Sequence, residues 1–256
     1  MMIVAGLASL ALAQTTGSIF GRASDPSGAV VAGAGISVTN QATGQPRQAT
    51  TDGQGEYSLP LLPVGTYSVS GEKQGFEKVT QRNVVVPVNT NVRVDLRFAV
   101  GKVTEVVEAV GGAEIVETRS STLGKVIEER KIRELPLNDR NFLNFATLQP
   151  GVIPAAEITS NNTPAFSCGV RSVFHVNGLR QQSNNFLLDG ADNNEPFLGT
   201  CMVSPSPDAL EEFKIQTNLY SAEFGGGGSV VNIITKGGSN DLHGTVYEFF
   251  RNDVFD

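Results

Sequence analysis

The sequence contains no tryptophan and only two cysteines and two histidines, and these shortages exclude several kinds of site. Cys168 and Cys201 do not form a CxxC pair, and the two histidines, at positions 175 and 243, do not form a closely spaced pair either, so an ordinary four-ligand zinc site is not expected. No HxxE or HExxH element occurs either, so zinc-peptidase chemistry has no ligands. We therefore expect no metal site and no cofactor.

Basic residues and long hydrophobic runs are also scarce. The 19 Lys and Arg residues are outnumbered by 26 Asp and Glu residues, and the formal net charge is −7. The sequence has no dense cluster of basic residues, which a protein needs to bind the phosphate groups of a nucleic acid. After residue 13 no stretch reaches the roughly 18 apolar residues that a membrane-spanning helix needs. We expect neither a nucleic-acid partner nor a transmembrane helix.

Residues 1–13 (MMIVAGLASLALA) form one apolar run that ends in Ala-Leu-Ala before Gln14. This pattern is typical of the hydrophobic region and cleavage site of a secretory signal peptide, although no Lys or Arg precedes it. The alternative is a buried first helix.

In an exported chain, Cys168 and Cys201 are predicted to form a disulfide; the alternative is two unpaired surface thiols.

Residues 17–99 alternate between short β-prone segments and turn signals rich in Gly, Pro, Asn and Asp. In residues 91–98, Val92, Val94, Leu96 and Phe98 alternate with polar residues, which predicts one buried and one wet face. Seven strands with regular turns favour a β-sandwich. We expect these strands at residues 18–23, 34–39, 47–51, 56–59, 65–71, 79–86 and 91–98.

The same region carries the segments GSIFGR (17–22), DPSGA (25–29), TTDGQGEYSL (50–59) and LPVGTYSV (62–69). Together they resemble the carboxypeptidase regulatory-like domain, which we place at residues 15–99. The resemblance implies a transthyretin-like, Ig-like sandwich that serves as an accessory module. It carries no peptidase machinery, and we expect the protein not to be an enzyme.

Residues 100–112 are predicted to link this sandwich to a second domain. A β-prone segment there, followed by Gly111 and Gly112, resembles the TonB box, the energy-coupling strand of TonB-dependent receptors. Such a segment adds to the open edge of a partner's sheet, here the TonB C-terminal domain. The alternative is an ordinary strand of a neighbouring domain. The predicted coupling residues are Val103, Thr104, Glu105, Val106, Val107, Glu108 and Ala109.

Residues 113–238 show the pattern of a small α+β domain. We predict one helix over residues 126–135, stopped by Pro136, and a second that begins with Asn138 or Asp139 as N-cap and ends before Pro150. Strands are expected at 173–176, 185–188, 213–217 and 230–235. The fold class is thus mainly β with a smaller α+β part.

The second domain resembles the plug of TonB-dependent receptors of the Oar-like branch, through LPLNDRNF (135–142), LQPGV (148–152), VNGLR (176–180), NFLLDG (185–190), LEEFKI (210–215) and GSVVNIITKGG (228–238). A plug fills the lumen of a β-barrel, which suits a polar, glycine-rich domain. The resemblance implies substrate-facing loops on this plug. Their predicted ligand-facing residues are Arg171, Arg180, Asp189, Asp192 and Asn193.

Three other chemistries are weighed against ordinary structural roles. Gly225–Gly228 lacks the Gly-Lys-Ser/Thr element of a phosphate-binding loop. Residues 189–195 (DGADNNE) cluster oxygen donors for Ca²⁺ without EF-hand spacing, so a solvated turn is favoured. His175, with Ser172 or Asp189, lacks a nucleophile elbow and is interpreted as structural.

Residues 239–256 resemble the first barrel strand of such receptors. A barrel of about 22 strands needs roughly 200–240 residues in the membrane alone, so the barrel is expected to be missing and the chain to be a fragment or a truncated product.

We expect the N-terminal part of an outer-membrane receptor, with sandwich and plug on the periplasmic side, that takes up an unknown carbohydrate or peptide. The alternatives are a secreted carbohydrate- or protein-binding adhesion module and an exported hydrolase, for which no nucleophile–base pair is found.

Overall fold

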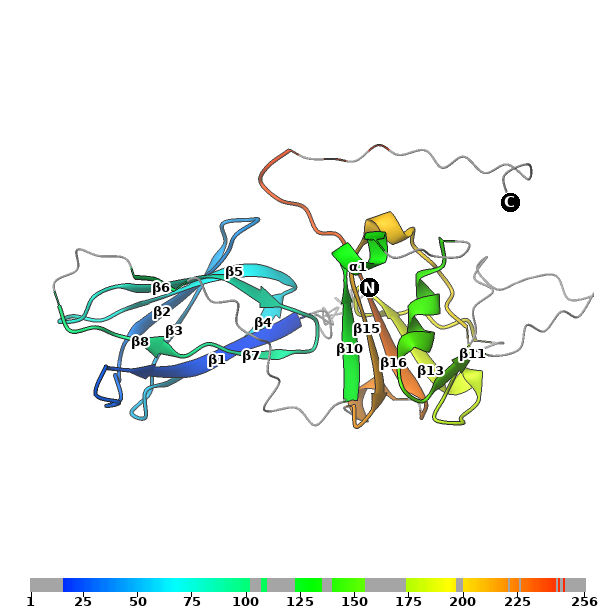
Figure 1. Ribbon diagram of the computed structural model, residues 1–256, viewed down its shortest axis with the longest axis horizontal. Helices are drawn as coiled ribbons and strands as arrows, with labels where there is room; N and C mark the ends of the chain where they lie inside the picture. Colours follow the sequence, from blue (N-terminus) through cyan, green and yellow to red (C-terminus); the bar gives the residue numbers. More distant parts are fainter. Residues whose placement is uncertain are drawn as a thin grey trace, which may run out of the picture.

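The computed structural model describes residues 16–101, 107–109, 123–134, 140–154, 174–196, 200–220, 222–225, 227–242, 244 and 246 (Figure 1). The predicted signal peptide at residues 1–13 lies outside the described residues. So do Val103–Val106, Cys168, Arg171, Ser172 and most of the expected barrel strand.

The first domain is a β-sandwich of two sheets, as the turn-rich sequence predicts. One sheet has the order β4-β1-β7, with β8 also paired to β1, and the other has the order β3-β2-β5-β6-β9. A single apolar core between them contains Ile19, Val69, Leu96 and Phe98. The strands are β1 (Thr16–Ser24), β2 (Gly35–Asn40), β3 (Pro46–Thr50), β4 (Glu56–Pro63), β5 (Gly65–Glu72), β6 (Val79–Val86), β7 (Asn91–Arg93), β8 (Leu96–Arg97) and β9 (Val107–Ala109).

Two turns of the sandwich are built in the same way from an Asp-x-x-Gly segment. The Oδ1 atom of Asp25 accepts hydrogen bonds from the N–H groups of Ser27 and Ala29, both at 2.9 Å. Asp52 Oδ1 accepts from Gln54 and Glu56 in the same way. Such side-chain bonds to the backbone two residues on favour turns, which confirms the turn signals predicted at these positions.

The strand predicted over residues 91–98 is divided in the structure into β7 and β8. Both pair in parallel with β1, and the predicted burial of Val92, Val94, Leu96 and Phe98 is confirmed. The division falls where the backbone of Val94 comes so close to Gly21 that a Cβ at position 21 would lie 1.7 Å from the Val94 oxygen. Glycine at position 21 is therefore required by the close approach of two backbones.

The second domain is an α+β unit around a five-stranded sheet of order β10-β15-β16-β13-β14. β11 and β12 form a separate antiparallel pair, and β13 runs parallel to β16. Its elements are β10 (Leu123–Glu128), α1 (Glu129–Glu134), η2 (Phe142–Leu148), β11 (Val152–Pro154), β12 (Phe174–Val176), η3 (Gln181–Ser183), β13 (Asn184–Leu188), β14 (Ala191–Asp192), η4 (Pro207–Ala209), β15 (Leu210–Asn218), η5 (Ala222–Phe224) and β16 (Ser229–Thr235).

Two helix predictions need correction. The helix expected over residues 126–135 is a helix only in α1, because residues 126–128 continue β10 and pair with β15. Tertiary pairing of the β-branched Val126 and Ile127 overrides the helical pattern there. The second helix is a 3₁₀ helix, η2, and its N-cap is Asn141, whose Oδ1 accepts from the Leu143 N–H at 3.0 Å.

One face of the five-stranded sheet packs against η2 and the β11–β12 pair. Phe142 and Phe213 meet edge to face with ring centroids 5.4 Å apart, and Phe174 meets Phe186 in a similar way. The core also includes Ile215, on the same face of β15 as Phe213. This core covers one face of the sheet, and the polar residues of β15 lie on the opposite face.

Candidate functional sites

The predicted coupling segment is partly described, as β9. β9 is the edge strand of the second sandwich sheet and pairs in parallel with β6, with Val107 opposite Val79, Glu108 opposite Thr80 and Ala109 opposite Gln81. The segment is thus extended and pairs with the sandwich, which is what the alternative, an ordinary strand of a neighbouring domain, expected. Its role in coupling stays a prediction.

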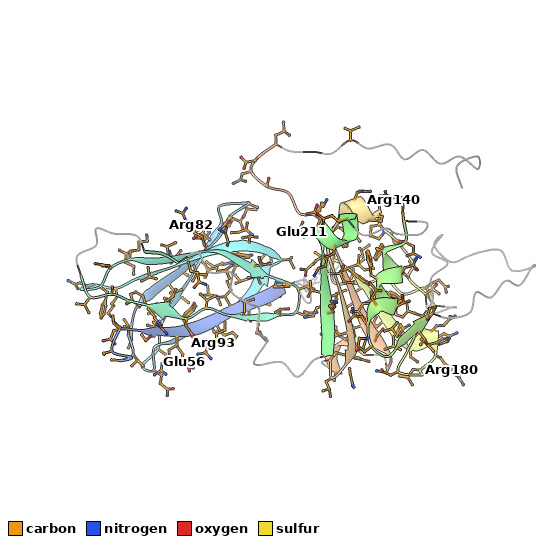
Figure 2. The ribbon with its side chains drawn as sticks, in the orientation of Figure 1. Glu56, Arg82, Arg93, Arg140, Arg180 and Glu211 are labelled. Carbon is orange, nitrogen blue, oxygen red and sulfur yellow. The ribbon has the colours of Figure 1, made fainter. Side chains whose placement is uncertain are left out.

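The predicted ligand-facing residues differ in their environments. Arg180 is exposed at the end of the second domain that lies away from the sandwich (Figure 2). Asp189 is exposed in the β13–β14 turn, with a φ of 48°, and both its carboxylate oxygens accept hydrogen bonds from Thr235, at 2.9 and 2.7 Å. Arg180 has a solvent-facing position, whereas the carboxylate of Asp189 closes a turn.

Asn193 is only 4% exposed, and its amide binds the neighbouring segment. Its Nδ2 donates to the Val203 oxygen and its Oδ1 accepts from the Val203 N–H, both at 2.8 Å. Asp192 is exposed, and its Oδ1 accepts from the Asn194 N–H at 3.1 Å. Asn193 thus positions the segment that contains Val203, and contact of Asp192 and Asn193 with a ligand stays a prediction.

Several side-chain oxygens of residues 189–195 accept hydrogen bonds from neighbouring segments, as Asp189 does from Thr235 and Asn193 does from Val203. Asn194 Oδ1 accepts from the Phe186 N–H at 2.9 Å, and its Nδ2 donates to Asn185 Oδ1 at 2.7 Å. Across the part of the chain that the structure describes, no group of three or more His, Cys, Asp or Glu side chains is placed to hold a metal ion. A hydrogen-bonded turn accounts for these residues.

Cys201 lies buried in the core of the second domain. Its Sγ is 3.2 Å from Asn193 Nδ2 and 3.0 Å from the Val203 oxygen. Because Cys168 is outside the described residues, the predicted disulfide stays a prediction.

The contacts of His175 and of the glycine segment favour structural roles. His175 is half-buried on β12, and its Nδ1 lies 3.0 Å from the Leu179 oxygen, while the carboxylate of Asp189 is bound to Thr235. The N–H groups of Gly227 and Gly228 both donate to the Ser183 oxygen, at 3.4 and 3.0 Å. These two amides close a loop against η3 and are not directed toward a phosphate.

A polar hollow on the sandwich was not found from the sequence. It has a volume of about 540 Å³, and its lining includes Arg22, Glu56, Tyr57 and Arg93. Figure 2 shows Glu56 and Arg93 on the same side of the sandwich. Arg93 forms an ion pair with Asp95 at 2.9 Å. The hollow joins β1, β4 and β7, which are distant in sequence, so no local motif marks it.

The chain was compared with known proteins. Residues 18–99 match the model of the carboxypeptidase regulatory-like domain. The chain is 29% identical over 206 residues to the TonB-dependent transporter Oar of Myxococcus xanthus, which covers 77% of this chain and 18% of that relative. The chain therefore spans less than a fifth of the length of this relative.

Two solved structures show weaker likeness. The siderophore receptor PirA of Acinetobacter baumannii is 22% identical, with 46% of this chain and 17% of that chain covered and a TM-score of 0.34. A putative carbohydrate-binding protein of Bacteroides uniformis is 24% identical, with 32% and 40% covered and a TM-score of 0.28. These TM-scores are too low to support an assignment.

Among the described residues, no helix combines the length and the apolar character that crossing a membrane requires. The matched domain occupies the sandwich, and the similarity to the Oar transporter extends over most of the chain. The chain is thus similar over most of its length to part of an Oar-like TonB-dependent receptor, and it carries a carboxypeptidase regulatory-like domain at its N-terminal side.

Proposed function

We propose that this chain is the N-terminal part of an outer-membrane TonB-dependent receptor that takes up a ligand by energy-coupled transport. The observation that carries the proposal is the 29% identity to a TonB-dependent transporter over 77% of the chain. The order of the parts agrees with it, since a sandwich, a β-prone segment and an α+β domain with plug-like motifs follow one another. In this proposal residues 1–13 direct export, and the second domain is the plug of a barrel.

The coupling partner in this proposal is the C-terminal domain of TonB. Residues 103–109 would bind it by adding a strand to an open sheet edge, where backbone hydrogen bonds give affinity and alternate side chains give specificity. The position of β9 at the edge of a sheet supports this role, because an edge strand is the one that can be exchanged between partners. The ligand would bind to plug loops, with exposed Arg180 and Asp192 as its candidate contacts.

The test is a binding titration with a peptide of residues 103–110 and a purified TonB C-terminal domain. We expect saturable binding, and we expect the same peptide with Val107→Pro to bind much more weakly, because proline removes a backbone N–H from the strand. A known TonB-box peptide serves as positive control. If that control binds and the peptide of this chain does not, the coupling role is wrong.

The alternative, a secreted carbohydrate- or protein-binding module, has the polar hollow of the sandwich in its favour. The two proposals differ in what the gene encodes after residue 256. Several hundred residues of alternating strands would support the receptor, and a stop codon would support the binding module. The similarity to a transporter favours the receptor.

A further inference from the structure

The face of the second-domain sheet opposite the apolar core carries a row of buried polar residues. Glu212, Lys214 and Gln216 alternate along β15 with the core residues Phe213 and Ile215. The three polar side chains are only 3–5% exposed. Charged side chains are rarely buried to this degree unless they are paired. We call Glu212 and Lys214 the docking pair.

Both side chains of the docking pair form hydrogen bonds with the sandwich. Lys214 Nζ donates to the Val88 oxygen at 3.1 Å, to the Asn89 oxygen at 2.8 Å and to Thr90 Oγ1 at 3.0 Å. Glu212 Oε1 accepts from the Val88 N–H. The ammonium and the carboxylate thus bind acceptors and a donor of the same three residues, 88–90, which we call the docking loop.

The docking loop is held in shape by the sandwich itself. Asn89 has a φ of 48°, and its N–H donates to the Thr16 oxygen at 3.1 Å. Thr90 Oγ1 donates to the Val88 oxygen at 3.0 Å, and the Thr90 oxygen accepts from the Ser18 N–H at 2.9 Å. The loop therefore presents two carbonyls and a hydroxyl to Lys214 without needing to be ordered on binding, which lowers the entropic cost of docking.

A second contact joins the sandwich to the segment that follows the second domain. After β16 the chain returns toward the turn between β2 and β3, as the orange-to-red segment of Figure 1 shows. There the Asn240 N–H donates to the Ala42 oxygen at 3.0 Å, and Asn240 Nδ2 donates to the Thr43 oxygen at 2.7 Å. The sandwich is thus bound at two separate places, to β15 and to the segment after β16.

We propose that the docking pair on β15 is a binding site for the docking loop and that it joins the sandwich and the second domain into one mechanical unit. Water would hydrate both charges in an undocked state, so the net gain from burying them is modest. Their main effect is specificity. A segment with one donor and several acceptors, placed as in the docking loop, is complementary to both charges.

The consequence for coupling rests on the proposed function. β9 pairs with β6, and β6 ends at Val86, two residues before the docking loop begins. A pull on residues 103–109 would therefore load β6, the docking loop and then β15, inside the second-domain sheet. The sandwich would carry force to the plug in addition to the covalent connection through residues 110–122.

The test is hydrogen exchange, followed by mass spectrometry, on the whole chain with Lys214→Met. We expect amide exchange in residues 88–90 to rise roughly tenfold or more, because hydrogen bonds to a charged group are lost. The radius of gyration in solution scattering should also increase. Core amides of β1 and β16 should keep their protection. Lys125→Met, an exposed lysine on neighbouring β10 of the same sheet, should change none of these.

A loop-side variant covers the case in which Lys214→Met perturbs folding. Thr90→Val keeps the shape of the side chain and removes the hydroxyl that Lys214 binds, so it should raise exchange in residues 88–90. In the double variant the two effects should be clearly less than additive, because both remove the same contact. Wild-type exchange in residues 88–90 of folded Lys214→Met, or additive effects, would overturn the docking proposal. The peptide titration with TonB is independent of β15, so it can fail or succeed separately.

Discussion

Replacing Asn193 by alanine would remove the contacts that hold residues 201–203 beside the β13–β14 hairpin. The side chain bonds both the N–H and the oxygen of Val203, and its Nδ2 also lies 3.2 Å from Cys201 Sγ. Because Asn193 is only 4% exposed, little water can reach its side chain. The variant therefore tests whether Asn193 holds the plug-like domain together or belongs to a surface that meets a ligand.

The expected cost follows from the bonds that are lost. A neutral hydrogen bond contributes about 1 kcal/mol net, and a buried backbone group left without a partner costs about 1–3 kcal/mol. Val203 is half-exposed, so water can reach part of its backbone, and the penalty for its two groups lies at the low end of this range. Partial relaxation of the loop offsets part of it, so we expect the free energy of unfolding of the second domain to fall by about 2–4 kcal/mol.

Differential scanning calorimetry is the suitable assay, because the chain has no tryptophan and two domains can unfold separately. For a domain of about 100 residues, each kcal/mol lowers Tm by roughly 4 °C or more, so a shift of about 10 °C is expected. Asp192→Ala is the matched control. Its side chain is exposed, and its removal should cost less than about 1 kcal/mol. Equal Tm shifts for the two variants would refute the reasoning.

Three further predictions concern stability. Gly21→Ala should prevent β1 from packing beside Val94, with a loss of at least about 3 kcal/mol in urea unfolding, and an unchanged midpoint would contradict this. Tyr57→Phe should cost about 1–3 kcal/mol in the same assay, because the buried hydroxyl donates to the Val94 oxygen at 2.6 Å; a loss within error of zero would show that this oxygen finds another donor. Burial, followed by the charge of Glu129, raises the pKa of Glu211, and the charge of Lys236 opposes this shift. At a pH between the usual and the raised pKa, the folded chain therefore binds more protons than the unfolded chain. Stability therefore falls as pH rises through this window, and Glu211→Gln should have a higher Tm than wild type at about pH 7 and a similar Tm at about pH 4; a pH-independent difference would exclude this cause.

Local sequence patterns predicted most of the sandwich. The alternation of Val92, Val94, Leu96 and Phe98 defines a buried face whatever the partner strand is, and Asp25 and Asp52 form turns through contacts within four residues. Such features depend on neighbours in sequence, so they can be derived without a structure.

The helix predictions show that local patterns are not sufficient where a segment pairs with a distant strand. Residues 126–134 suit a helix by charge pattern, and only pairing with β15 makes residues 126–128 a strand. The location of the helix start at Asn141 depends in turn on which Asn side chain meets a free N–H, since several polar residues precede the apolar run.

The candidate sites divide in the same way. Sequence alone determined the two-domain order, the sandwich, the β-prone coupling segment and the resemblance to a transporter, because each depends on short motifs that occur in a fixed order along the chain. Only the tertiary structure decided that Asn193 is buried, that β9 lies on β6, and that Glu212 and Lys214 bind a loop more than 120 residues earlier. The physical reason is that alternating polar residues on a strand look alike whether they face water or a partner domain, and the difference arises only when the two domains meet.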